Sequence, residues 1–502
     1  MTGTGPAQIA GNAESRGPVV LAQHPTRIAG LDQILRGGLP VGGAYLLAGT
    51  PGTGKTTLGN QLAFAHAAHG GTSIFATLLA ETHDRMLAHL AGFSFLDPTH
   101  IGSRIHYLGL LSSLEDGGLD GVLDAVRDLV RGLGATLLVI DGTRLLEDVA
   151  PSSLDFRRFT AQLQAQSAML GCTTVLLTNR HPEQTDDIAT HLDGVIHLLQ
   201  EPIASRERRM LRVVKLRGVG HLTGRHEFAI TTEGIVVSPR VEALPEARAL
   251  LTTLAPERLS TGVPGLDAML EGGLLTGSST LLVGNPGAGK TLTGMHFIAD
   301  GAERGEPGLI AGFHESPQRL VATAAGVGLD LGRYVDEGLV RILWQLPTEL
   351  SPDAWAQRLL TAVAEQRPAR LLVDALTDVH QHIVPSERLS DYLTALVTLL
   401  RAEGVTSLFA AELDTLIGPE LRIPVPTVSA VLDNTILLRR FELGSQLHRL
   451  VSVIKVRQSG ADPTLREFDI TSRGITIGEP FSRATALLTG SAMLVGRDEP
   501  PL

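Results

Sequence analysis

Short apolar runs alternate with helical patterns along the whole chain. Runs such as AYLLAG, ATLLVID and TTVLLTN in the first half, and STLLVGN, RLLVDA and TSLFAAE in the second, are separated by longer segments. Leu58, Leu62 and Ala65 recur at helical spacing in one such segment. Apolar runs with helices between them are typical of buried parallel strands. The pattern predicts α/β domains that begin with a strand, a loop and a helix.

The chain also repeats itself. The segment RIAGLDQILRGGLPVGGAYLLAGTPGTGKTTL, from Arg27, resembles STGVPGLDAMLEGGLLTGSSTLLVGNPGAGKTLT, from Ser260. A period of more than 200 residues (Lys55 to Lys290) is too long for a solenoid repeat, so it indicates a duplicated domain. The intervening stretch SPRVEALPEARALLTTLAPERLS, with three prolines, predicts the boundary. We expect a disordered N-terminus, a first domain, a linker, a second domain and a tail, at residues 1–20, 21–245, 246–259, 260–490 and 491–502.

Each copy holds a glycine-rich motif of the form GxxxxGK[ST]. The motifs are GTPGTGKT from Gly49 and GNPGAGKT from Gly284. Glycines let such a loop turn its backbone N–H groups toward an anion, and the next helix presents its N-terminus to phosphates. The lysine reaches the β- and γ-phosphates, so Lys55 and Lys290 are candidate catalytic residues. The residues expected to bind ATP are Gly49, Thr50, Pro51, Gly52, Thr53, Gly54, Lys55, Thr56, Thr57, Gly284, Asn285, Pro286, Gly287, Ala288, Gly289, Lys290, Thr291 and Leu292.

A magnesium site is predicted beside each loop. Asp141 and Asp374 each end an apolar run, the position that holds Mg²⁺ in P-loop proteins. The hydroxyls of Thr56 and Thr291 are the second ligand of each site. The alternative is an ordinary strand-end aspartate that caps a loop.

Glu81 and Glu315 follow an apolar run about 25 residues after each P-loop lysine. A carboxylate there can polarise a water for attack on the γ-phosphate. The alternative is an acid near a helix start, where glutamate is favoured in any case.

Lysine is rare in this chain. Besides Lys55 and Lys290, it occurs only as Lys215 and Lys455, each in a K-x-R pattern with Arg217 or Arg457. Residues i and i+2 of a strand point to the same side, and two cations there favour a phosphate partner. The alternative is a solvated basic edge strand.

Composition excludes several classes. The net charge of −11 and the 4% aromatic content argue against a protein that coats DNA or stacks on single strands, so a nucleic-acid partner is not expected. The single cysteine, Cys172, excludes a disulfide framework. No run reaches 18 apolar residues and no secretory pattern begins the chain, so we expect a cytoplasmic protein without a membrane partner.

The motifs resemble those of the KaiC family, a branch of the RecA-type ATPases. The resemblance spans residues 24–490 and rests on the GLDxxLxGG lead-ins, both P-loops, the Glu-Thr and Glu-Ser turns, the aspartate strands and the K-x-R strands. It implies two tandem RecA-like P-loop ATPase domains, each a mostly parallel sheet flanked by helices. It also implies a homo-oligomer, a two-tiered hexameric ring that binds ATP and Mg²⁺ between neighbouring chains.

The resemblance further implies that Lys215, Arg217, Lys455 and Arg457 contact phosphate in trans. Members of the family transfer phosphate to a Ser-Thr pair in the second half, where this chain has Ser429 and Ala430. They also carry paired glutamates, where this chain keeps only Glu81 and Glu315. We therefore expect an ATP-hydrolysing signalling protein with an unknown protein partner, with serine autokinase activity at Ser429 as an open possibility. A DNA-acting RecA-family motor and a nucleotide-sensing scaffold with little turnover are the alternatives.

Overall fold

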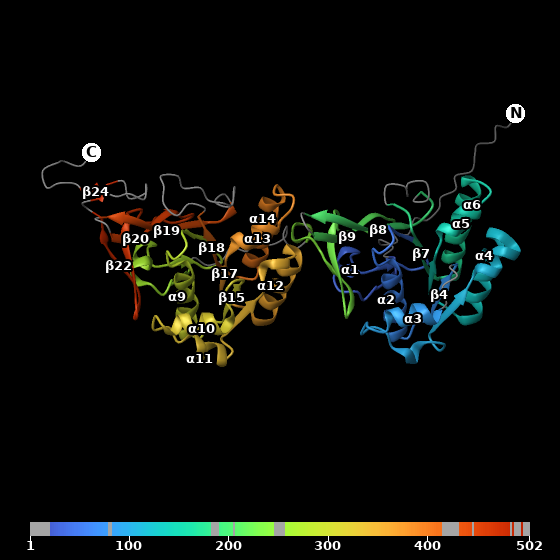
Figure 1. Cartoon of the computed structure of the whole chain (residues 1–502), viewed down its shortest axis with the longest axis horizontal. Coiled ribbons are helices and arrows are strands. Elements are labelled where there is room, and N and C mark those ends of the chain that lie inside the picture. Colours follow the sequence, from blue (N-terminus) through green and yellow to red (C-terminus); the bar gives the residue numbers. More distant parts are fainter. Residues whose placement is uncertain are drawn as a thin grey trace, which may run out of the picture. The chain divides into compact units, whose positions relative to one another are not determined.

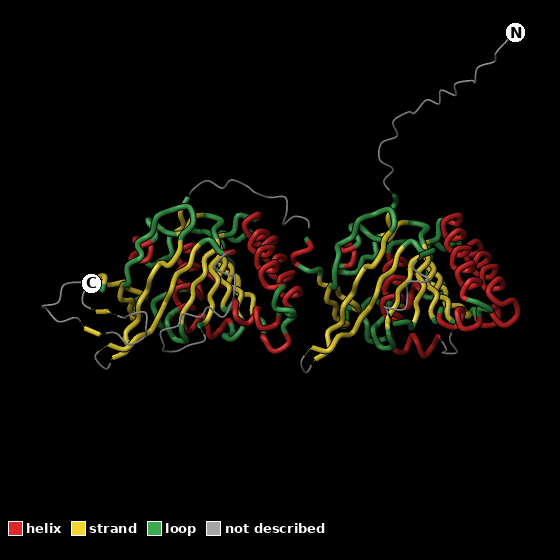
Figure 2. Tube along the Cα trace, turned by 90° about the horizontal axis from the view of Figure 1, so that it is seen from above, coloured by secondary structure: helices red, strands yellow, loops and turns green. Residues whose placement is uncertain are grey.

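The computed structural model describes residues 21–78, 83–181, 190–203, 206–244, 257–413, 431–443, 446–481, 484–485 and 493–494. The chain divides into two compact units, Met1–Ser238 and Pro239–Leu502 (Figure 1). Each unit is an α/β domain built on one sheet, as the duplicated sequence pattern predicts. In each of them the strands run side by side and helices pack against the sheet (Figure 2).

The first unit contains a nine-stranded sheet of order β11-β10-β9-β8-β3-β7-β6-β4-β5. The strands from β8 to β5 in this order are parallel, and β9, β10 and β11 extend the sheet as antiparallel hairpins. Strands of this unit are β1 (Gln23–His24), β2 (Leu39–Pro40), β3 (Ala44–Gly49), β4 (Ser73–Thr77), β5 (Ile105–Gly109), β6 (Leu137–Asp141), β7 (Thr173–Thr178), β8 (Gly194–Ile203), β9 (Arg206–Leu216), β10 (His226–Thr231) and β11 (Gly234–Ser238).

Helices of the first unit connect the parallel strands. They are α1 (Leu31–Ile34), α2 (Lys55–Ala68), α3 (His83–Leu90), α4 (Leu111–Leu133), α5 (Arg144–Val149) and α6 (Ser153–Leu170), with the short 3₁₀ helix η1 (Pro98–His100). The residues Leu58 and Leu62, singled out by their spacing, are buried on α2. Cys172 is buried just before β7, where burial raises the pKa of its thiol to about 12.

The second unit repeats this sheet in the order β22-β21-β20-β19-β14-β18-β17-β15-β16. Its strands are β12 (Arg258–Leu259), β13 (Leu274–Leu275), β14 (Ser279–Gly284), β15 (Gly308–Gly312), β16 (Val340–Trp344), β17 (Arg370–Asp374), β18 (Thr406–Glu412), β19 (Asn434–Leu443), β20 (Gln446–Lys455), β21 (Arg466–Thr471) and β22 (Gly474–Pro480), followed by the separate pair β23 (Ala484–Thr485) and β24 (Met493–Leu494). Its helices are α8 (Pro264–Met269), α9 (Lys290–Glu303), α10 (Pro317–Ala325), α11 (Leu331–Asp336), α12 (Pro352–Gln366), α13 (Leu376–His382) and α14 (Arg388–Ala402), with 3₁₀ helices η3 (Val241–Ala243) and η5 (Pro347–Glu349).

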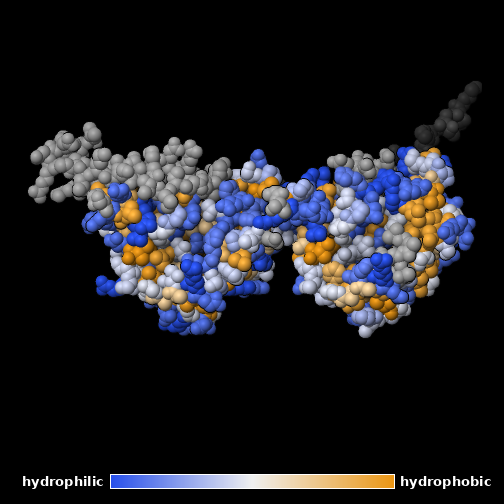
Figure 3. Space-filling model, viewed as in Figure 1, coloured by the Kyte–Doolittle hydropathy of each residue, from blue (hydrophilic) through white to orange (hydrophobic). Residues whose placement is uncertain are grey.

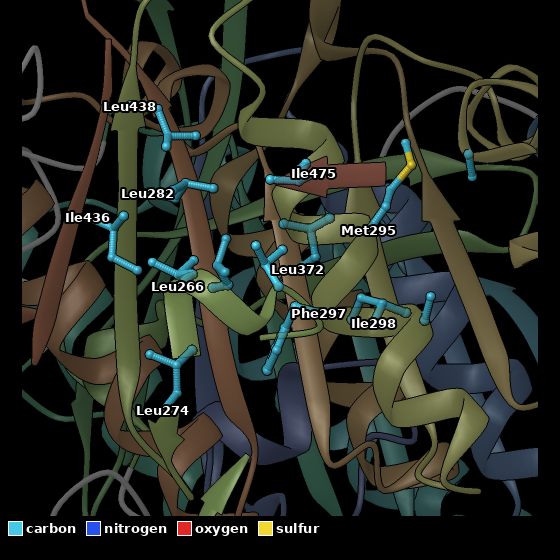
Figure 4. Close-up of a cluster of buried hydrophobic side chains, with 14 of the residues drawn as sticks. Leu266, Leu274, Leu282, Met295, Phe297, Ile298, Leu372, Ile436, Leu438 and Ile475 are labelled. Carbon is cyan, nitrogen blue, oxygen red and sulfur yellow. The ribbon is translucent and has the colours of Figure 1, made fainter. Parts of the chain in front are cut away.

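Each core lies between the sheet and its helices. In the second unit the packed side chains come from strands β14, β17 and β19 and from helices α8 and α9, as Figure 4 shows for Leu282, Leu372, Ile436, Leu266 and Phe297. Burying such side chains is the main favourable contribution to folding. The surface seen in Figure 3 intersperses hydrophilic and hydrophobic residues over both units.

The two units meet at Ser238 and Pro239, at the start of the proline-containing stretch that the sequence predicts as the boundary. Residues 239–244 make their contacts with the second unit. Arg388 on α14 donates to both carboxylate oxygens of Glu242 and to Asp353 Oδ1 at 2.5 Å, and the backbone N–H of Val241 donates to the same Asp353 oxygen. Expected features that lie outside the described residues are the N-terminus at 1–20, most of the linker at 246–259, and the tail at 491–502 apart from 493–494.

Candidate functional site

Each P-loop lies between a central parallel strand and the helix that follows it. The first loop joins β3 to α2, and the second joins β14 to α9, so Lys55 and Lys290 are the first residues of their helices. Gly54 and Gly289 precede them with φ of 95° and 106°, in the left-handed region. A Cβ on Gly289 would lie 2.6 Å from Phe468 Cζ, so both conformation and space require glycine there. The loop therefore directs its backbone toward the helix N-terminus, as an anion site requires.

Both P-loop lysines are folded back onto their own loops. Lys55 Nζ donates to Thr50 O at 2.9 Å, and Lys290 Nζ donates to Gly284 O at 2.9 Å and Asn285 O at 3.1 Å. Each side chain is largely buried, and this desolvation lowers the pKa of both ammonium groups. A buried ammonium group that bonds mainly to the loop's polar groups is a ready binding partner for phosphate oxygens.

The predicted magnesium ligands meet in both units. Thr56 Oγ1 donates to Asp141 Oδ2 at 2.7 Å, and Thr291 Oγ1 donates to Asp374 Oδ2 at 2.6 Å. Burial raises the pKa of the Asp374 carboxyl, so a cation bound beside it would stabilise the ionised form. A hydroxyl and a carboxylate are the oxygen donors that Mg²⁺ prefers, usually together with waters and substrate phosphates. The residues present therefore fit Mg²⁺, although the described residues contain no cluster of three or more metal-ligating side chains.

A cavity of about 710 Å³ opens beside the second P-loop. Thr291 and Asp374 line it together with Glu315, which follows β15. Ser316 caps the N-terminus of α10 by accepting from Arg319 N, so the helix-start interpretation holds for this serine. The carboxylate of Glu315 nevertheless faces the cavity, and its Oε2 is buried without a hydrogen bond to any described residue. An acceptor in this position suits a water or hydroxyl near the γ-phosphate.

Three further residues of this cavity were missed at the level of sequence. His314 Nε2 and Asp378 Oδ1 are 2.8 Å apart, and Asp378 is mostly buried on α13. Glu412 ends β18, and its Oε1 is 3.4 Å from Lys290 Nζ. The only signal for Glu412 was a charged residue at the end of an apolar run, TSLFAAE, and nothing in the sequence paired it with a lysine 122 residues away.

The K-x-R residues lie away from the P-loop of their own unit. Lys215 on β9 pairs with Val195 on β8, and Val195 in turn pairs with Leu46 on β3. Leu46 lies three residues before Gly49, where β3 ends and the P-loop begins. That offset is about 10 Å along the strand, on a strand beyond β8. In both units a bulge precedes the lysine, at the register shifts Val195/Ile196 and Thr435/Ile436.

The two cations of each pair lie on one side of the hairpin. Lys215 Nζ and Arg217 Nη2 both donate to Thr190 O, at 3.3 and 2.8 Å. Lys455 Nζ donates to Leu432 O at 2.9 Å, and Arg457 lies 3.8 Å from Asp433. The lysines belong to β9 and β20, whereas the arginines lie just beyond the strand ends.

Two predicted residues cannot be placed. Glu81 and Ser429 both lie outside the described residues. The remaining candidates of the ATP motif, including Thr57 and Leu292 in the first turns of α2 and α9, lie in the loops and helix starts described above.

This combination of features defines a class. A P-loop on a central parallel strand, a strand-end aspartate bonded to the P-loop threonine, and an antiparallel extension of the sheet make each unit a RecA-like P-loop ATPase domain. The family model for the KaiC ATPase matches residues 24–242 and again residues 259–482. The chain therefore belongs to the KaiC family and contains its ATPase domain twice.

Curated relatives match along nearly the whole chain. The circadian clock oscillator protein KaiC of Picosynechococcus sp. is 27% identical over 492 residues, covering 94% of this chain and 93% of that protein. The proteins of the same name from Acaryochloris marina and Thermostichus vulcanus are 26% and 27% identical, covering 94% and 95% of this chain and 92% of each relative. Among the described helices, none is both long and apolar enough to cross a bilayer.

Proposed function

We propose that the chain binds and hydrolyses Mg-ATP at both P-loops and acts as a signalling ATPase in a two-tiered homo-hexameric ring. The observation that carries this proposal is the repeated contact between the P-loop threonine and a strand-end aspartate, at 2.7 and 2.6 Å. Both copies of the duplicated domain have kept this hydroxyl–carboxylate contact beside the P-loop.

Each residue has a defined task in this proposal. Backbone N–H groups of the loops and the ammonium groups of Lys55 and Lys290 bind the β- and γ-phosphates. Thr56 with Asp141, and Thr291 with Asp374, would hold Mg²⁺, which offsets the charge that develops on the phosphate oxygens. Glu315 orients a water for in-line attack by accepting its proton, and Glu81 has the same task in the first unit.

We assign the K-x-R pairs to the nucleotide of a neighbouring chain. Lys215 and Lys455 lie about 10 Å along the sheet from the level of their own P-loops, so they cannot contact a phosphate there. Each pair gathers two cations on one side, where a phosphate is the expected partner. A head-to-tail contact of this kind closes into a ring, and the ring implied by the family is a hexamer.

A phosphoryl transfer to Ser429 is a second outcome of the same chemistry. The serine Oγ would attack the γ-phosphorus in place of water, the bond to the ADP oxygen would break, and Glu315 would accept the hydroxyl proton. The support is the aligned serine at 429 and the acceptor oxygen of Glu315 in the cavity. Alanine at 430 leaves one acceptor in the segment where members of the family have two.

One experiment tests both outcomes. Purified protein is incubated with Mg-ATP, and released phosphate is measured beside the intact mass of the same sample. Release in the unmodified chain that falls in Lys55→Ala and again in Lys290→Ala supports two hydrolytic sites. A gain of about 80 Da, the mass of one phosphate, that disappears in Ser429→Ala supports the autokinase. No release and no mass gain would overturn the proposal.

A further inference from the structure

Among the described residues, the second P-loop lysine has a carboxylate ion-pair neighbour and the first P-loop lysine has none. Glu412 Oε1 lies 3.4 Å from Lys290 Nζ, and about half of the glutamate side chain is exposed. The pairing of β14 with β18 sets Glu412 directly opposite Gly284, where the P-loop begins. The sheet therefore presents a carboxylate to the ammonium group that the phosphates of a nucleotide would contact.

The first unit has an amide in the corresponding place. β3 pairs with β7 so that Ala48 lies opposite Thr178, which puts Asn179 level with Gly49. No described carboxylate lies within 4 Å of Lys55 Nζ. The next residue after Asn179, Arg180, forms an ion pair with Glu147 on α5, so that carboxylate is engaged by an arginine rather than by the P-loop lysine. The two sites share a backbone frame but differ in charge beside the lysine.

The carboxylates of the second cavity cannot all face a nucleotide without cost. Glu315, Asp374, Asp378 and Glu412 line the same cavity, and Glu412 has its ion pair with the P-loop ammonium. When phosphates bind Lys290, Glu412 loses its ionic partner and gains a negative neighbour. Charges a few ångströms apart in a partly buried site interact strongly, so this exchange weakens binding.

We propose that Glu412 competes with the nucleotide for Lys290 and lowers the preference of the second site for nucleoside triphosphates over diphosphates. The inference rests on the proposed function, because it concerns the same P-loop. The penalty falls mainly on the triphosphate, because its γ-phosphate brings further negative charge to the lysine that Glu412 contacts. The first site, with Asn179, keeps the ordinary preference.

A reciprocal exchange tests the proposal. Glu412→Asn is made in a Lys55→Ala chain, so that only the second site binds, and Asn179→Glu is made in a Lys290→Ala chain, so that only the first site binds. Calorimetric titration with ADP and with AMP-PNP, a non-hydrolysable triphosphate, gives the affinity ratio in each. Glu403→Gln, an exposed acid after α14, is the matched control.

We expect Glu412→Asn to tighten AMP-PNP binding at the second site about tenfold and to change the ADP affinity much less. Asn179→Glu should weaken AMP-PNP binding at the first site about tenfold and likewise change the ADP affinity much less. An unchanged ratio of AMP-PNP to ADP affinity in Glu412→Asn overturns the inference, as does weaker AMP-PNP binding. The Asn179→Glu arm tests the inference independently if Glu412→Asn lowers the melting temperature. If neither single-site parent chain binds ADP or AMP-PNP, the proposed function itself has failed.

Discussion

The two units share one sheet topology but place different polar groups beside the helix that follows the P-loop. In the first unit, His66 on α2 forms a hydrogen bond of 2.7 Å between its Nε2 and Thr136 Oγ1. Its ring also contacts the ring of His24, with a centroid distance of 4.1 Å. In the second, Gly301 takes the place of His66, and Arg370 fills the space with ion pairs to Asp300 and Glu306. One copy thus uses imidazoles whose charge depends on pH, whereas the other uses a guanidinium whose charge does not.

A second difference lies at the start of matching helices. Asp155, near the start of α6, accepts from the Ser152 hydroxyl at 2.7 Å and completes a local cap. The matching end of α14 begins with Arg388, which binds Glu242 and the buried Asp353. Duplicated backbones therefore tolerate replacement of a local cap by a long-range ionic network. At both places the units keep the same backbone elements and differ in their polar contacts.

The largest effect should come from the trans cations. In a chain whose first site is silenced by Lys55→Ala, Lys455→Ala should lower phosphate release about 10³-fold, because cations supplied in trans stabilise the transition state by that order. Arg473→Ala, an exposed residue between β21 and β22, is the control. A phosphate-release assay that finds Lys455→Ala as active as the control would contradict the trans assignment.

Loss of the ionic network should destabilise only the second unit. Arg388→Ala leaves the buried Asp353, which is 1% exposed, without its cation, while Glu242 keeps its ion pair with Arg240. Breaking a buried pair by removing one partner costs about 3–5 kcal/mol. Ser152→Ala, which removes the N-cap of α6 in the first unit, should cost only about 1 kcal/mol, the typical value for a lost cap. Urea unfolding with two resolved transitions measures both. Equal shifts of the two transitions would show that the ionic network is not specific to one unit.

Removing the water-orienting carboxylate should give a smaller loss. Glu315→Gln should lower phosphate release from the second site about 10²-fold without weakening AMP-PNP binding, because general-base assistance is lost while the phosphate contacts stay. Glu81→Gln should do the same at the first site, with Glu337→Gln on the surface as the control. Weakened nucleotide binding in Glu315→Gln would instead assign that carboxylate to the metal or the nucleotide.

Acid should weaken the first unit more than the second, with the smallest effect of the four, because burial lowers the pKa of His24, His66 and His221 in the first unit and of His296 in the second. Burial lowers the pKa of His66 to about 4, and also lowers that of His24. The folded protein therefore keeps both rings neutral at pH values where the unfolded chain protonates them. The free energy of unfolding is unaffected by these rings above pH 6.5 and declines as the pH falls from 6.5 toward 4. At about pH 5 the loss should be about 1 kcal/mol, because one pKa unit corresponds to about 1.36 kcal/mol and solvent screens the partly exposed His66 ring. Melting curves at about pH 7.5 and about pH 5 should show it in the first unit, and His66→Gln should reduce it. A slope unchanged in that variant would contradict this assignment.

Much of this molecule could be predicted from sequence because its signals are local. Both P-loops, the strand-end aspartates and the alternating strands each occupy a few consecutive residues, and the structure confirms their placement. Glu412 and Arg388 could not be predicted, because their partners are brought to them by sheet register and helix packing over tens to more than a hundred residues.

The bulge before each K-x-R lysine has a genetic consequence. It presents those cations at the end of the sheet remote from the P-loop of the same chain, so on the proposed assignment every site draws on two gene products. Two alleles, one with Lys290→Ala and one with Lys455→Ala, would each be inactive alone at the second site. Expressed together they would complement, because a chain with an intact P-loop can sit beside one with an intact K-x-R pair. Either allele beside the wild type would be partly dominant, because it damages sites that contain a normal chain.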